Sequence, residues 1–353
     1  MTIHIPFNPR DAVRSGTVIA EGLLNPRGLC LEPDGSLLLV EAGSGHADQP
    51  LSGRISRLRP APGLSGHYQA PEVIAEGFRS MNMQVRMLRD EIMGLSDVCC
   101  AGGRCLASLT DYVDGSRILD LGQSPPTTLF RSRGNLNALC YHPGRRSWLS
   151  VKPDTNQVVE FVEGYDERVL VQLPDLAQGQ EAVPVTLVHE PATGALLVTL
   201  FSGELRRDPA LRGVEFADHA GQVIRVWPED GRIETVVFGL QLPTGLALTK
   251  DGNLLVLELC QRLLQPLTPD WAGAAWHGGF ERFSGRLLHC DLGRGTVAVL
   301  AEGLDTPSNL CLLPDAVLVS EGMGLSGRPL PTPGAGTAPL DGRIRRIPLT
   351  GLG

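Results

Sequence analysis

The sequence predicts an all-β fold, a six-bladed β-propeller with four-stranded blades that is closed by a strand from near the N-terminus. Three observations predict it. Glycine and proline, 42 and 27 of 353 residues, are too frequent for long helices. A phrase made of a proline turn, an apolar strand, an acidic-glycine turn and a second apolar strand recurs along the chain. A strand-like segment near the start matches a strand that is missing after the last phrase.

The phrase occurs six times. It is clearest at residues 25–41, 242–258 and 306–321, and degenerate copies start at Gly94, Asn135 and Val183. Alignment of the copies places one branched apolar residue in a common column: Leu29, Val98, Leu139, Leu187, Leu246 and Leu310. The shortest spacing in this column is the length of one four-stranded propeller blade, and the longer spacings indicate insertions.

Each copy supplies two strands, a third often follows, and a fourth precedes the next copy. Residues 17–22 look like a fourth strand without a blade, whereas the last copy ends at its third strand near Ile347. We therefore expect residues 17–22 to complete the last blade and leave only short edges. The expected single domain, 1–353, has its blades at 23–77, 94–131, 134–173, 183–238, 242–301, and 306–349 plus 17–22.

Charge and composition exclude several classes of partner. The 31 basic and 39 acidic side chains give a net charge of −8, which argues against nucleic acid and anionic membranes. The apolar runs are far shorter than a membrane span, and residues 1–10 contain no apolar core of a signal peptide. Eight cysteines without a secretion signal predict reduced thiols and a cytoplasmic location. We expect a monomer or a homodimer.

Three runs of residues carry a family resemblance. Asn25-Pro-Arg-Gly-Leu, continuing to Glu41-Ala-Gly-Ser-Gly, and the later Gly94-Leu-Ser-Asp-Val resemble NHL-type six-bladed propellers. With Ala182-Val-Pro-Val-Thr they are similar to the propeller proteins of scytonemin-type biosynthetic clusters, and more distantly to the gluconolactonase and strictosidine synthase families. The resemblance implies the fold along nearly the whole chain. It leaves the chemistry open, because propellers host many reactions.

The expected site lies at one opening of the ring. In such a blade the first strand begins, and the second strand ends, on the same face. Glutamates end the second strand in blades 1, 5 and 6, which become neighbours when the ring closes, whereas blades 2 to 4 place apolar residues there. We therefore predict Glu41, Glu258 and Glu321 as catalytic residues that line one sector of the central funnel.

Further candidates lie on the strand starts and on long loops at the same face. The loops at 42–52, 201–220, 259–284 and 322–341 follow second strands, and residues 78–93 add an apolar flap. His277 joins the predicted catalytic group. The predicted substrate-binding residues are Arg27, Asn137, His219, Trp276 and Phe280.

Three neighbouring carboxylates allow two chemistries. Glu41, Glu258 and Glu321 could hold a divalent cation such as Ca, Mg or Zn, or a desolvated pair could act as acid and base. The alternative is structural, with each glutamate capping backbone amides between blades. Gluconolactonase-like propellers hold their cation at strand starts, where this chain offers Asn137 with Asp97 and Asn309 one column over. That cation site does not carry over.

Cysteines share one column of the repeat. Cys30, Cys99, Cys140 and Cys311 align with Val188 and Ala247, which predicts a small buried contact between blades. Cys105 is expected in the core with them. The third strands alternate arginine with apolar residues, and we interpret these arginines as a solvated outer face.

These observations favour an enzyme of specialised metabolism that acts on a small molecule in the funnel. Glutamate acid–base chemistry of hydrolase or lyase type is the leading hypothesis, with no cofactor beyond the cation considered above. A Pictet–Spengler-like condensing enzyme, a non-catalytic propeller that binds a protein or peptide, and a quinone-dependent dehydrogenase are the alternatives.

Overall fold

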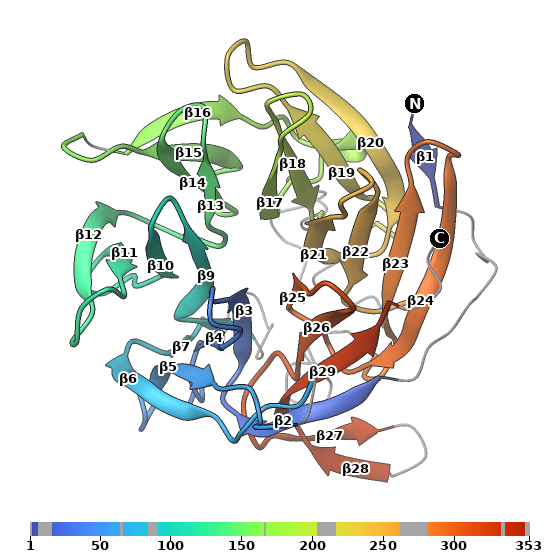
Figure 1. Cartoon of the computed structure of the whole chain (residues 1–353). Coiled ribbons are helices and arrows are strands. Elements are labelled where there is room, and N and C mark those ends of the chain that lie inside the picture. Colours follow the sequence, from blue (N-terminus) through green and yellow to red (C-terminus); the bar gives the residue numbers. More distant parts are fainter. Residues whose placement is uncertain are drawn as a thin grey trace, which may run out of the picture.

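The computed structural model describes residues 2–5, 16–63, 66–83, 91–165, 167–202, 217–261, 281–332 and 336–349. Six antiparallel sheets stand around a common axis, each with its first strand innermost (Figure 1). This is the predicted six-bladed propeller, with one addition on blade 4. No helix of the described residues is long and apolar enough to cross a membrane.

The first three blades are sheets of four strands in sequence order. Blade 1 contains β3 (Pro26–Leu31), β4 (Leu37–Glu41), β5 (Gly53–Leu58) and β6 (Glu72–Phe78). Blade 2 contains β9 (Leu95–Ala101), β10 (Arg104–Leu109), β11 (Ser116–Asp120) and β12 (Thr127–Ser132). Blade 3 contains β13 (Cys140–His142), β14 (Ser147–Lys152), β15 (Gln157–Phe161) and β16 (Arg168–Gln172).

The last three blades follow the same plan. Blade 4 contains β17 (Pro184–Glu190), β18 (Ala195–Leu200), β19 (Gly221–Val226) and β20 (Ile233–Leu240). Blade 5 contains β21 (Pro243–Leu248), β22 (Leu254–Glu258), β23 (Gly285–Asp291) and β24 (Thr296–Leu304). Blade 6 contains β25 (Asn309–Leu312), β26 (Ala316–Glu321), β29 (Gly342–Pro348) and β2 (Thr17–Leu23).

The N-terminal strand closes the ring as predicted. β2 pairs antiparallel with β29, with Thr17 opposite Arg346, and so supplies the outer strand of blade 6. A second N-terminal strand, β1 (Ile3–His4), was not predicted. It pairs in parallel with β20 as a fifth strand of blade 4, and buries Ile3 and Ile5 in the core between blades 4 and 5. These alternating isoleucines explain why so short a segment docks on a strand edge.

Smaller elements lie in the insertions. β7 (Met81–Asn82) pairs with β8 (Ile92–Met93), and β27 (Pro329–Thr332) pairs with β28 (Gly336–Pro339). A short 3-10 helix, η2 (Ala177–Gly179), precedes blade 4. The two hairpins occupy the segments predicted as the apolar flap and as the blade 6 loop.

The core consists of apolar layers between successive blades. The repeat column that carries four cysteines contributes one residue to each layer, because successive first strands face each other there. The Cys100 N–H donates to Cys30 Sγ (3.1 Å). Backbone N–H groups of the following blade bond the other three thiols in the same way, from Tyr141 to Cys99, from His189 to Cys140 and from Leu31 to Cys311. The column is therefore a contact between blades, as predicted.

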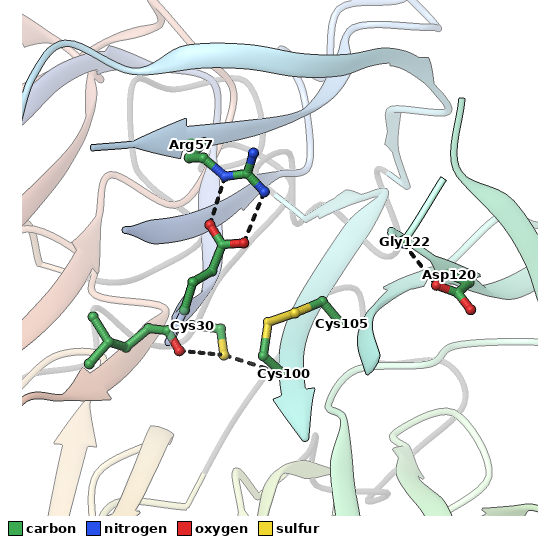
Figure 2. The surroundings of a disulfide bond; sticks show 8 residues. Cys30, Arg57, Cys100, Cys105, Asp120 and Gly122 are labelled. Carbon is green, nitrogen blue, oxygen red and sulfur yellow. Dashed lines mark hydrogen bonds and ion pairs between the residues drawn. A yellow bond between two sulfur atoms is a disulfide. The ribbon is translucent and has the colours of Figure 1, made fainter. Parts of the chain in front are cut away.

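Two of the eight cysteines depart from the prediction of reduced thiols. Cys100 on β9 and Cys105 on β10 form a disulfide, with Cα atoms 4.0 Å apart (Figure 2). The antiparallel register places the two residues directly opposite each other, across a tight turn. The prediction is therefore wrong for this pair. The remaining six cysteines carry thiols and are not part of this disulfide.

Candidate functional site

The three predicted glutamates end β4, β22 and β26, and each side chain is fully buried. Each faces an arginine near the start of the third strand of its own blade. The antiparallel register places Glu41 opposite Arg54, Glu258 opposite Arg286 and Glu321 opposite Arg343. The strand register therefore places a guanidinium next to each of these carboxylates, where it can form an ion pair without any ligand.

Glu41 and Glu321 are saturated by protein donors. Glu41 Oε1 accepts from Arg54 Nε (2.7 Å) and from the Ser56 hydroxyl (2.9 Å), and its Oε2 accepts from the Leu24 N–H (2.7 Å). Glu321 lies 3.0 Å from Arg343 Nε and accepts from Arg345 Nε at 2.6 Å.

Glu258 is also held by an arginine and a backbone amide, and in addition it has a histidine, His219, nearby. It accepts from the Gln241 N–H (2.7 Å) and from Arg286 Nε. Burial raises the pKa of Glu258, and Arg286 and His219 oppose the rise. The backbone N–H of His219 donates to Gln241 Oε1 (2.6 Å). The other polar atom of this amide, Gln241 Nε2, is buried without a hydrogen-bond partner among the described residues. His219 and Glu258, both predicted site residues, thus lie near each other.

The glutamates are not gathered into a metal site. Within the described ranges, no group of three or more His, Cys, Asp or Glu side chains could hold a metal ion. The physical reason is that each carboxylate is taken up by an arginine and, for Glu41 and Glu258, also by a backbone amide. These residues do not fit the predicted cation.

The interpretation of the third-strand arginines as a solvated face is wrong. Arg54, Arg343 and Arg345 pair with the buried glutamates, and Arg57 pairs with Glu32 at 2.7 Å. A signal for this was present in the sequence. Blades 1, 5 and 6 end the second strand with Glu, and they alone begin the third strand with Gly-Arg: Gly53-Arg54, Gly285-Arg286 and Gly342-Arg343.

Asp97 on β9 is a buried carboxylate of another kind. Its side chain is 8% exposed, and no arginine or lysine of the described residues lies within 4.0 Å of it. All other buried carboxylates of those residues have an arginine within that distance: Glu41, Asp111, Glu160, Glu190, Glu258, Asp305 and Glu321. Asp97 instead accepts from the Leu139 N–H (2.9 Å) and the Val98 N–H (2.9 Å).

The position of Asp97 is at the centre of the ring. Asn309 Nδ2 of blade 6 donates to Asp97 Oδ1 (3.2 Å), although blade 1 separates the two blades. Gly28 of blade 1 makes room for this contact, because a Cβ there would overlap Asp97 Oδ1. Asp97 thus touches the innermost strands or strand starts of blades 1, 3 and 6. Burial raises its pKa to about 7, and the three hydrogen bonds oppose the rise.

The remaining predicted residues divide into two groups. Arg27 lies at the start of β3, and Asn137 Nδ2 donates to the Val185 carbonyl of blade 4 (3.2 Å). Ser308 and Thr244 make comparable ties to the next blade, so Asn137 is part of a belt that joins first strands. His277, Trp276 and Phe280 lie outside the described residues.

The loops that follow β4 and β26 are joined above blades 1 and 6. Asn25 Nδ2 donates to the Gly43 carbonyl (3.1 Å), and Asn25 Oδ1 accepts from the Gly324 N–H (2.7 Å). The Ser326 N–H donates to the Ser44 carbonyl (3.2 Å), and His46 Nε2 lies 2.8 Å from the Ser326 carbonyl. We call this the blade 1–6 bridge (residues 42–46 and 322–326). It fixes the surroundings of Arg27.

Comparison with known proteins shows the fold. No protein-family model matches the sequence, and no curated protein matches it. Among solved structures, a protein of unknown function from Bacteroides thetaiotaomicron has a TM-score of 0.56 at 11% identity, covering 96% of this chain and 72% of that chain.

Two further solved structures are similar over most of the chain. A streptogramin B lyase has a TM-score of 0.51 at 12% identity, covering 94% of this chain and 97% of that chain. An auxiliary nutrient binding protein from Bacteroides thetaiotaomicron has a TM-score of 0.52 at 10% identity, covering 97% of this chain and 75% of that chain. At such identities the likeness shows the fold alone. The chain is a six-bladed β-propeller whose structural neighbours include a lyase.

Proposed function

We propose that this protein is an enzyme that acts on a small molecule at the centre of the propeller, with Asp97 as its acid–base group. The observation that carries the proposal is that Asp97 is buried without a cationic partner, whereas the other buried carboxylates of the described residues are ion-paired. A carboxyl group with a pKa of about 7 exchanges its proton readily near neutral pH. The ion-paired glutamates are suited to holding the blades.

A lyase-type elimination is the reaction class that one such group serves best. The Asp97 carboxylate takes a proton from a carbon next to an electron-withdrawing group, and the C–H electron pair forms the new double bond. The bond to the leaving group breaks with its electrons, and the Asp97 carboxyl returns the proton to the leaving group. The protein ends in its starting state. Hydrolysis would require an additional activated water molecule.

The finer assignments rest on the sequence. The repeat phrases support kinship with NHL-type propellers and with proteins of specialised metabolism. We also propose a monomer or homodimer, and a cytoplasmic location because six of the eight cysteines carry thiols. The predicted divalent cation at Glu41, Glu258 and Glu321 is not part of this proposal. A quinone-dependent dehydrogenase is the alternative whose His277 lies outside the described residues.

The test is a comparison of turnover by three proteins in a small-molecule extract of the source organism. Mass spectrometry follows which compounds are consumed and whether two products appear whose masses sum to that of the substrate. We expect turnover by the wild type and by Asp315→Asn, a control at an exposed aspartate, and about a hundredfold loss or more in Asp97→Asn. Undiminished turnover by folded Asp97→Asn overturns the proposal, as does binding of a compound by the wild type without turnover.

A further inference from the structure

The strongest unassigned feature outside Asp97 is the guanidinium of Arg27. Arg27 Nη2 donates to the Ile92 carbonyl (2.9 Å), and Nη1 donates to the thioether sulfur of Met323 (2.7 Å). A thioether is a weak acceptor. Arginine carries five N–H donors in a planar fork, so this side chain keeps donors for another group.

Arg27 also lacks a counter-charge in contact. The arginines that face the buried glutamates each have a carboxylate at ion-pair distance, but no described carboxylate lies within 4.0 Å of Arg27. Burial lowers the pKa of Arg27 to about 10, while Glu91 acts from farther away and opposes the fall. A partly buried cation without an ion pair is costly in the free protein. An anion from outside would relieve that cost.

The surroundings of Arg27 are apolar and fixed. Ile92 is 2% exposed, and its side chain packs so closely on Gly45 that a Cβ at Gly45 would overlap it. Leu325 lies against the same glycine, where its Cδ1 would be 3.2 Å from such a Cβ. Gly45, Met323 and Leu325 all belong to the blade 1–6 bridge, which the hydrogen bonds described above hold in place. The two segments that hold the guanidinium thus carry the apolar side chains of Ile92, Met323 and Leu325 in fixed positions, which favours binding without reorganisation.

Arg27 is adjacent in sequence to Gly28, the residue against which Asp97 packs. Arg27 and Asp97 therefore both lie beside the start of β3. Guanidinium forms paired parallel hydrogen bonds with carboxylates and with phosphates. A carboxylate carries the smaller charge and costs less to desolvate beside apolar side chains, so it is the anion that these surroundings favour.

We infer that the ligand of this protein carries a carboxylate on an otherwise apolar small molecule, and that Arg27 binds that carboxylate. The inference rests on the proposed function, since it names the class of substrate for the same central site. Arg27 acts here as a binding and positioning residue, and Asp97 performs the proton transfer.

The experiment measures binding of matched probes by ligand-observed NMR. Phenylacetate and hexanoate are compared with phenylacetamide and hexanamide, which have the same apolar parts without the charge. We expect the wild type to bind the acids about tenfold or more tightly than the amides. The Arg27→Gln variant should lose that preference, and Arg27→Lys should keep part of it. Arg59→Gln, at an exposed arginine paired with an exposed Glu72, is the matched control and should behave as the wild type.

Equal affinity of the wild type for acids and amides, or no detectable binding of either acid, overturns the inference without any variant. Unchanged acid preference in Arg27→Gln also overturns it. The Asp97→Asn variant separates the two proposals, because it should keep acid binding while losing turnover. If Asp97→Asn keeps its turnover while acid binding still depends on Arg27, the proposed role of Asp97 is overturned and the carboxylate-binding site at Arg27 is retained.

Discussion

Buried carboxylates have opposite surroundings in two regions of the molecule, the strand ends of blades 1, 5 and 6 and the centre of the ring. At the strand ends, Glu41, Glu258 and Glu321 each meet an arginine from the neighbouring strand. At the centre, Asp97 receives only neutral donors, from two backbone amides and Asn309. Both carboxylate environments are buried, but only the first supplies a compensating charge. The contrast teaches that a glutamate repeated in register is neutralised by an arginine of the neighbouring strand, whereas the singular Asp97 has no such partner among the described residues.

The largest expected effect is at a strand end. Glu258→Gln removes the negative partner of Arg286, which is itself buried, and should lower the free energy of unfolding by about 3–5 kcal/mol. Urea denaturation of the variant and the wild type measures this. The matched control is Glu72→Gln, whose exposed pair with Arg59 is worth about 0–1 kcal/mol. Equal losses in the two variants would contradict the contrast.

Replacing Asp97 should raise the free energy of unfolding at neutral pH, whereas replacing Glu258 lowers it, and the effect should depend on pH. Its pKa is raised from 3.8 to about 7 in the folded protein, so between those values the unfolded chain has released a proton that the folded chain keeps. Stability contributed by protonated Asp97 is therefore present at low pH and is lost as the pH rises toward 7.

Unfolding measured from pH 4 to 8 tests this expectation. The wild type should lose a few kcal/mol relative to Asp97→Asn across that range, because a tenfold difference in proton affinity between the folded and unfolded states is worth about 1.4 kcal/mol. A difference between the two proteins that is constant with pH would contradict the raised pKa of Asp97.

The thiol column offers a smaller effect on the same innermost strands. Cys99→Val should change the free energy of unfolding by less than about 1.5 kcal/mol, because valine occupies the equivalent position 188 in blade 4. Burial raises the pKa of Cys99, so the wild-type thiol should also react slowly with iodoacetamide at a mildly alkaline pH. Rapid alkylation of Cys99 in the folded protein would place this column in contact with solvent.

The smallest expected effect concerns metal. Because arginines occupy the three glutamates, treatment with EDTA should leave the melting temperature unchanged, and added Ca²⁺ or Mg²⁺ should not raise it. Metal analysis of the purified protein complements this measurement. A stoichiometric cation that Glu258→Gln removes would favour the metal-binding interpretation of these glutamates instead.

The fold could be predicted from the sequence because each repeat is marked by residues that are close together in the chain. Turn residues and apolar strands recur, and the unpaired segment near the start fits the gap in the last blade. β1 was not accessible, since two residues carry no periodicity, and only burial of Ile3 and Ile5 selects the edge of blade 4. The candidate site was predicted less well. Ion pairing depends on cross-strand register, and the contact of Asp97 with Asn309 depends on the ring being closed over Gly28.

The pairing of β2 with β29 has a consequence for how the molecule is made. The first of these strands leaves the ribosome early, and its partner is synthesised only after the five blades that lie between them. Until β29 is synthesised, residues 17–23 have no strand with which to pair. Completion of the circle is therefore a late event in biosynthesis, since every contact of this strand with blade 6 must wait for the last strand of the chain.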